Sequence, residues 1–174
     1  MKKPTVTALC DLLNKPQLIT WANNIGLNGE SMKGFQRKVF DLGNKKHNEI
    51  EDFLLNGVCL DDLEKQKKIE DLFLDCQIIS IEEPFENDNY KGRVDIRFIK
   101  NGISYIGDFK SKFKKPYMEH YIQLIAYKMH FGCDKICIID LRDFILHEIS
   151  LEKENTYKEL INNLVNIFNL KQQL

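Results

Sequence analysis

The sequence lacks a long apolar run, an excess of one charge and any stretch rich in proline, glycine or serine. No apolar segment reaches the about 18 residues that a membrane-spanning helix needs, and Asp11 and Asn14 interrupt any signal-like stretch near the N-terminus. We therefore expect an intracellular protein with no membrane segment. The net charge of −1 also means that contact with a polyanion must come from a local basic patch.

Disulfide bonds and a cysteine zinc site are equally unsupported. The five cysteines are odd in number and scattered, which argues against a disulfide framework. Cys133 and Cys137 are four residues apart, but no second close pair exists to complete a zinc site. We expect buried thiols at Cys10, Cys59, Cys76, Cys133 and Cys137.

The length and the hydrophobic pattern predict one domain over residues 1–174, built in two parts. A chain of this length is the usual size of a single domain with a substantial core. Residues 1–75 are predicted to be mainly helical, with apolar residues at helical spacing in 17–25, 45–56 and 60–75. Residues 76–174 are predicted to form strands at 77–82, 93–99, 103–110, 135–141 and 144–149, and helices at 119–131 and 156–170. This order predicts an α/β fold.

One predicted hairpin brings two aspartates together. Asn101-Gly102 between two apolar strands is a strong hairpin signal, because both residues accept the positive φ of a tight turn. With these as the turn residues, Lys100 pairs with Ile103, and the residue numbers of every pair along the hairpin add up to 203. Asp95 and Asp108 therefore face each other, with Cβ atoms about 4.5–5.5 Å apart. Lys110 lies two residues beyond Asp108 and therefore on the same face. The opposite face would pack on the core through Val94, Ile96, Phe98, Ile103, Tyr105 and Phe109.

Two carboxylates in this arrangement point to a cation. At about 5 Å and an effective dielectric constant near 20, like charges repel by about 3 kcal/mol. That is a large part of the about 5–15 kcal/mol by which a fold is stable. A divalent cation between Asp95 and Asp108 would offset the repulsion, and oxygen ligands favour Mg²⁺ or Mn²⁺. The alternative is that Asp95 pairs with Lys110 or Arg93 and binds no metal.

Short motifs accompany the hairpin. Gly92 to Asp95 has the form Gly-x-x-Asp, and Asp108 to Lys110 has the form Asp-x-Lys, which alone is found by chance in most proteins. On the helix that follows, a Gln-x-x-x-Tyr motif, with His120 and His130 on the same stripe, predicts a polar helix face that lines a cleft. The alternative is a face that is merely solvated. The two residues of this motif are Gln123 and Tyr127.

Upstream of the hairpin, Gly43 and His47 have the form Gly-x-x-x-His, and Glu51 follows His47 by one helical turn. A lone histidine is more often a surface or core residue than a ligand, so His47 gains weight only from the other motifs. Glu51, Glu82 and Glu83 are candidates for a further carboxylate in the same site, although Glu83 also precedes a proline that could end a strand.

In this order and at these spacings, the four motifs resemble the RecB-like branch of the PD-(D/E)xK nucleases. The resemblance covers roughly residues 4–140, and residues 4–9 and 18–27 are similar to phage exonucleases and mitochondrial genome maintenance exonucleases of that branch. Asn44 stands where the family usually has threonine. The resemblance implies a restriction-endonuclease-like core, with a central mixed β-sheet flanked by helices, and metal-dependent hydrolysis of phosphodiester bonds.

The resemblance also implies roles for single residues. It implies one or two Mg²⁺ or Mn²⁺ ions, with the ligands His47, Asp95, Asp108 and the backbone carbonyl of Phe109. Lys110 would orient or activate the attacking water and offset charge on the scissile phosphate. Gln123 and Tyr127 would complete the catalytic site. Some members carry an iron–sulfur cluster, which would need cysteines near the C-terminus, and none follows Cys137.

Basic and aromatic residues near the motifs predict a local contact with DNA. Arg37 and Lys38 precede His47. Candidates to stack on unpaired bases are Trp21, Tyr117 and Tyr121, although Trp21 could instead pack in the core. The residues expected to contact nucleic acid directly are Lys45, Lys46, Lys112, Lys114, Lys115 and Tyr117.

The sequence is therefore expected to encode a DNA exonuclease that prefers single-stranded ends, and the exonuclease part follows from the resemblance alone. A structure- or sequence-specific endonuclease of the same superfamily is one alternative, which at this length would need a dimer or a recognition segment. A non-catalytic nucleic-acid-binding relative is the other alternative. The presence of Asp95, Asp108 and Lys110 together speaks against it.

Overall fold

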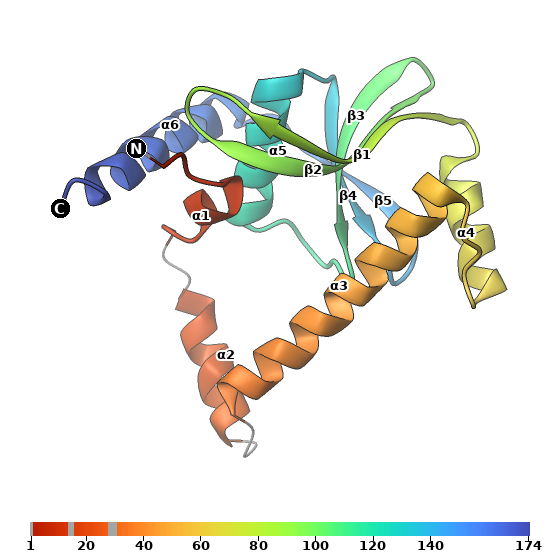
Figure 1. Cartoon of the computed structure of the whole chain (residues 1–174), viewed down its shortest axis with the longest axis horizontal. Helices are drawn as coiled ribbons and strands as arrows, with labels where there is room; N and C mark the ends of the chain where they lie inside the picture. Colours follow the sequence, from red (N-terminus) through yellow and green to blue (C-terminus); the bar gives the residue numbers. More distant parts are fainter. Residues whose placement is uncertain (1, 14–15, 28–30) are drawn as a thin grey trace.

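Helices precede and flank a five-stranded sheet in the computed structural model of the chain (Figure 1). The structure describes residues 2–13, 16–27 and 31–174. The helices are α1 (Val6–Cys10), α2 (Pro16–Leu27), α3 (Met32–Asn56), α4 (Leu63–Phe73), α5 (Met118–Phe131) and α6 (Glu154–Lys171). The strands are β1 (Cys76–Glu86), β2 (Lys91–Lys100), β3 (Ile103–Lys110), β4 (Lys135–Asp140) and β5 (Ile145–Ile149). Within these residues, no helix combines the length and the apolar character needed to cross a membrane.

The sheet is mixed, with the strand order β1-β2-β3-β4-β5. Neighbouring strands are antiparallel except β3 and β4, which are parallel and are joined by the crossover helix α5. Asn101 and Gly102 have φ angles of 52° and 77°, as the predicted hairpin turn requires. The predicted α/β class, with a mixed sheet flanked by helices, is confirmed.

Each face of the sheet has its own hydrophobic core. On one face the sheet packs against α1, α5 and α6, through residues such as Ile106 and Ile122. On the other face it packs against α3 and α4, through residues such as Ile50 and Ile69. Figure 1 shows α3 crossing the sheet on the side away from α5 and α6, while α2 and the start of α3 lie apart from the sheet. Because both faces are covered, the inner strand β4 is an almost continuous buried run of apolar residues.

The register of the β2–β3 hairpin follows the prediction as far as the ladder extends. Lys100 pairs with Ile103 and Ile96 pairs with Gly107, so the paired positions sum to 203. The pairing ends there, one position before the two aspartates. The strands separate at this point, which leaves the carboxylates of Asp95 and Asp108 at the mouth of the opened hairpin.

The prediction that Val94 shares a face with Ile96 was wrong. Val94 packs in the core beneath α5, whereas Ile96 packs in the core beneath α3. Opposite Asp95, Glu82 has a left-handed φ of 50°, and the β1–β2 ladder skips this position. A local irregularity of this kind breaks the alternation of faces between Val94 and Ile96.

Some element boundaries also differ from the prediction. The helix expected at 45–56 begins at Met32, where Oγ of Ser31 accepts a hydrogen bond of 3.1 Å from the amide of Gly34. The strand expected at 77–82 continues to Glu86 through Pro84, which an edge strand tolerates. Of the cysteines expected to be buried thiols, Cys10 and Cys137 are buried, Cys76 and Cys133 are only partly buried, and Cys59 is exposed. None of the five forms a disulfide in the part of the chain that the structure describes.

Candidate active site

A pocket of about 1110 Å³ lies where β2 and β3 separate. Side chains from α1, α3, α5 and the first three strands line it. Four motifs that are far apart in the sequence therefore meet in one place. The pocket contains every residue that the sequence predicted to be catalytic or to bind metal, namely His47, Asp95, Asp108, Phe109, Lys110, Gln123 and Tyr127.

Asp108 is the most enclosed charged group of the pocket, with 1% of its surface exposed. Nε2 of Gln123 donates a hydrogen bond of 2.7 Å to its Oδ1, and Nζ of Lys110 lies 2.5 Å from its Oδ2. Burial raises the pKa of Asp108 to about 7, although the charge of Lys110 opposes the shift. Burial lowers the pKa of Lys110, but the carboxylates of Asp108 and Asp95 outweigh it, so the pKa is raised and the side chain stays an ammonium.

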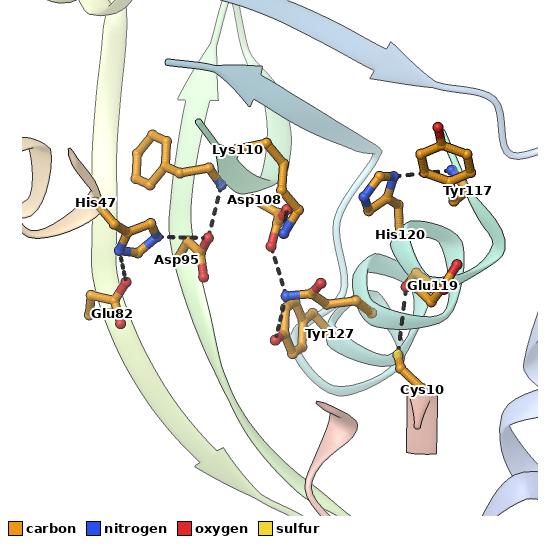
Figure 2. Close-up of polar contacts among 12 residues, drawn as sticks. Cys10, His47, Glu82, Asp95, Asp108, Lys110, Tyr117, Glu119, His120 and Tyr127 are labelled. Atoms are coloured by element: carbon orange, nitrogen blue, oxygen red, sulfur yellow. Dashed lines mark hydrogen bonds and ion pairs between the residues drawn. The ribbon is translucent and has the colours of Figure 1, made fainter. Parts of the chain in front are cut away.

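Gln123 and Tyr127 line the pocket from α5, as predicted. Nε2 of Gln123 also donates to the hydroxyl of Tyr127 over 3.2 Å, so the two side chains form one polar row that ends at Asp108 (Figure 2). Gly92 makes this row possible, because a Cβ at position 92 would lie 2.8 Å from a ring carbon of Phe85 and 3.1 Å from one of Tyr127. Close packing against these two rings therefore explains why the first residue of the Gly-x-x-Asp motif is a glycine.

Asp95 and His47 form a second set of contacts at the opposite wall. Oδ2 of Asp95 accepts a hydrogen bond of 2.8 Å from the amide of Phe109, and Nε2 of His47 lies 3.1 Å from the same oxygen. The ring of Phe109 packs edge-on against His47, with the centroids 5.5 Å apart. Burial lowers the pKa of His47, but Asp95 and then Glu82 outweigh it, so the pKa is raised.

Glu82 also belongs to the site, although the sequence indicated it only as one of three candidates for a further carboxylate. Its side chain is 7% exposed, with Oε1 3.2 Å from Nδ1 of His47 and Oε2 2.6 Å from Nε of Arg93. Figure 2 shows Glu82 and Asp95 on the two sides of the His47 ring. Nothing in the strand pattern signals the left-handed backbone that turns Glu82 into the pocket. Arg93 pairs with Glu82, and Lys110 pairs with Asp108. Neither residue forms the ion pair with Asp95 that was the alternative to a metal site.

The residues predicted to contact nucleic acid lie outside the pocket. Four of them are exposed on the segment between β3 and α5, namely Lys112, Lys114, Lys115 and Tyr117. Lys45 is exposed with Nζ 3.8 Å from Glu49, and Lys46 lines a separate pocket of about 350 Å³. The basic residues at the rim of the main pocket are instead Lys91 and Arg93, for which the sequence predicted no contact with nucleic acid.

Other predicted contacts have mixed outcomes. Tyr121 was a candidate for base stacking, but its ring stacks on Tyr157 with the centroids 4.7 Å apart. His120 accepts a hydrogen bond of 3.1 Å from the amide of Tyr117, and the ring of His130 stacks on a phenylalanine. Arg37 is exposed, whereas the side chains of Trp21 and Lys38 lie outside the described residues.

Comparison with known proteins adds little to this geometry. No protein-family model and no curated protein matches the chain. Among solved structures, the chain is similar to the crystal structure of SSO0001, with 24% sequence identity and a TM-score of 0.37. The match covers 60% of this chain and 56% of that chain. A similarity at this level assigns neither a fold family nor an activity.

Proposed function

We propose that this protein is a Mg²⁺- or Mn²⁺-dependent deoxyribonuclease with a restriction-endonuclease-like core of the PD-(D/E)xK type. The observation that carries the proposal is the meeting of Asp95, Asp108 and Lys110 in one pocket, at the point where the hairpin opens. Gln123 and Tyr127 enter the same pocket from the helix that follows, as the motif resemblance requires.

The donor atoms suit a hard divalent cation. Oδ2 of the buried Asp108 accepts no hydrogen bond of good geometry within the described residues and has only the ion pair with Lys110. A buried ionised carboxylate costs several kcal/mol in lost solvation, and a cation shared with Asp95 would offset this cost. We propose Asp95, Asp108 and the carbonyl of Phe109 as its ligands, because oxygen ligands suit Mg²⁺ and Mn²⁺. His47 supports this set through Nε2, which contacts Asp95.

The side chains around this site have separate tasks in phosphodiester hydrolysis. When bound, the cation supplies a water nucleophile at neutral pH and stabilises negative charge on the phosphate. The ammonium of Lys110 donates hydrogen bonds to the attacking water or to a phosphate oxygen. Gln123 holds Asp108 in one orientation through its hydrogen bond of 2.7 Å. The hydroxyl of Tyr127 accepts from Gln123, so its own proton is available to the substrate.

We propose DNA with single-stranded ends as the substrate and exonucleolytic cleavage as the mode, on the strength of the motif resemblance. Lys91 and Arg93 at the rim of the pocket support binding of a polyanion, because they place positive charge beside the acidic centre. The overall charge of −1 is compatible with a short nucleic-acid contact at this rim.

End-labelled DNA tests the proposal. The protein is incubated with single-stranded, duplex and closed circular DNA in Mn²⁺, Mg²⁺ or EDTA, and the products are resolved by length. We expect linear single strands to be degraded with either metal and to survive in EDTA and with Asp108→Asn. Cleavage of closed circles would favour the endonuclease alternative. Binding of DNA without cleavage in either metal would favour the non-catalytic alternative.

A further inference from the structure

A second group of ligand atoms lies on the wall of the pocket opposite Asp108. His47, Glu51 and Glu82 each offer one donor atom, and these atoms all lie within 4.8 Å of one another. His47 and Glu51 are four residues apart on α3 and so share one helix face. Glu82 approaches them from β1. The group therefore links the long helix to the edge strand of the sheet.

The contact between Glu82 and His47 has the geometry of two neighbouring ligands. Oε1 of Glu82 lies 3.2 Å from Nδ1 of His47. This oxygen is buried and accepts no hydrogen bond from any described residue. Arg93 holds the other oxygen of the same carboxylate at 2.6 Å, so Oε1 is left directed at the ring. Ligands about 2.1 Å from one cation and at right angles to each other lie about 3 Å apart.

The orientation of His47 leaves Nδ1 available. A neutral imidazole carries one N–H donor and one lone pair. If Nε2 carries the proton, it donates to Oδ2 of Asp95 at the observed 3.1 Å, and the lone pair is on Nδ1, facing Glu82. A carboxylate that holds the far nitrogen of a histidine is the usual partner of a metal-bound imidazole. The edge-on contact with Phe109 fixes the plane of the ring.

We propose that Nδ1 of His47 and the carboxylates of Glu51 and Glu82 form a second cation site, separate from that of Asp95 and Asp108. Its cation is a first-row transition ion such as Mn²⁺ in preference to Mg²⁺ or Ca²⁺, because one ligand is an imidazole. This proposal deepens the proposed nuclease function, since the ion holds His47, and through it Asp95, in place. Its own role is to position these residues by tying α3 to β1.

Counting bound Mn²⁺ by electron paramagnetic resonance, without DNA, tests the site. We expect the wild type to bind two Mn²⁺ per chain, and Glu82→Gln and Glu51→Gln to bind one, with at least a tenfold loss of affinity at the missing site. Glu83→Gln and Glu49→Gln are the matched controls, because they remove a neighbouring charge outside the group. Both controls should bind as the wild type does, and circular dichroism checks that every variant is folded.

Asp108→Asn separates this inference from the nuclease proposal. We expect this variant to lose one Mn²⁺ and to keep the one that depends on Glu51 and Glu82. If Glu82→Gln and Glu51→Gln bind as much Mn²⁺ as their controls, or if the wild type binds none, the second site does not exist. Cleavage of DNA in Mg²⁺ by the wild type would still support the nuclease in either case. Conversely, Mn²⁺ held at the second site without any cleavage would overturn the nuclease proposal alone.

Discussion

The two walls of the pocket acquire their polar residues in different ways. We call one wall the Asp108 wall; its polar side chains come from β3 and from α5, which follows it, at spacings of two and four residues, and are Asp108, Lys110, Gln123 and Tyr127. We call the opposite wall the Glu82 wall; its polar side chains are His47 and Glu51 from α3 and Glu82 from β1. The helix α4 lies between α3 and β1 in the sequence. Short-range spacing is visible in a sequence, so the first wall could be predicted. The second wall required the packing of α3 against the sheet.

The walls also differ in their exposure to solvent. Asp108 is 1% exposed, and its contacts with Lys110 and Gln123 are enclosed. The Glu82 wall opens toward water through Arg93, whose side chain is 65% exposed. Charges interact more strongly where water is excluded. We therefore expect substitutions on the Asp108 wall to have larger effects than matched substitutions on the Glu82 wall.

The largest effect is expected when the walls are compared by activity. Asp108→Asn should lower the rate of DNA cleavage on the order of a thousandfold or more, because a metal ion contributes several kcal/mol to this chemistry. Glu82→Gln should lower it by about 10–100-fold, the usual cost of disturbing a residue that orients a metal ligand. Initial rates at saturating DNA measure both. Equal losses would contradict the division into a catalytic and a positioning wall.

A pH series without metal tests the burial of Asp108. Its pKa of about 7 in the folded protein lies above the unfolded value near 3.9. The stability that it contributes is therefore fully present below about pH 4 and is lost as the pH rises through about 7. Relative to Asp108→Asn, the wild type should lose about 2–3 kcal/mol between pH 5 and pH 8 in EDTA. Urea denaturation measures the difference, and a constant difference would mean that the carboxyl is solvated.

Two glycines test the packing of the Asp108 wall. Gly92→Ala should destabilise the protein by about 1–3 kcal/mol, because its Cβ would lie 2.8 Å from the ring of Phe85. Gly43→Ala is the matched control on α3, where a Cβ meets nothing within 4 Å and helix propensity should add up to about 1 kcal/mol. Thermal unfolding compares the two. If both variants are more stable than the wild type, the rings of Phe85 and Tyr127 do not pack closely against Gly92.

The smallest effect is expected in DNA binding at the rim. Lys91→Ala should weaken binding to single-stranded DNA a few-fold and reduce the salt dependence by about one phosphate contact. Lys114→Ala, which lies outside the pocket, should change neither. Fluorescence anisotropy in EDTA at several salt concentrations measures both quantities. The reverse result would show that DNA follows the segment after β3, as the sequence predicts.

The sequence alone predicted the hairpin, its register and the residues of the Asp108 wall. The positive-φ turn at Asn101-Gly102 and the alternation of side chains along β3 are local properties, so counting residues was enough to bring Asp95, Asp108 and Lys110 near one another. The helical spacing of Gln123 and Tyr127 placed both on one face for the same reason. These predictions depend only on backbone geometry within short segments.

Only the tertiary structure decided where the hairpin opens and what forms the second wall. The left-handed backbone of Glu82 interrupts the alternation next to Asp95, and no residue type announces such a conformation at a glutamate. The pairing of Arg93 with Glu82 and the position of Lys91 at the rim likewise depend on how β1 pairs with β2 beside the pocket. Local spacing determined which residues could share a face, and long-range packing determined which of those faces enclose the site.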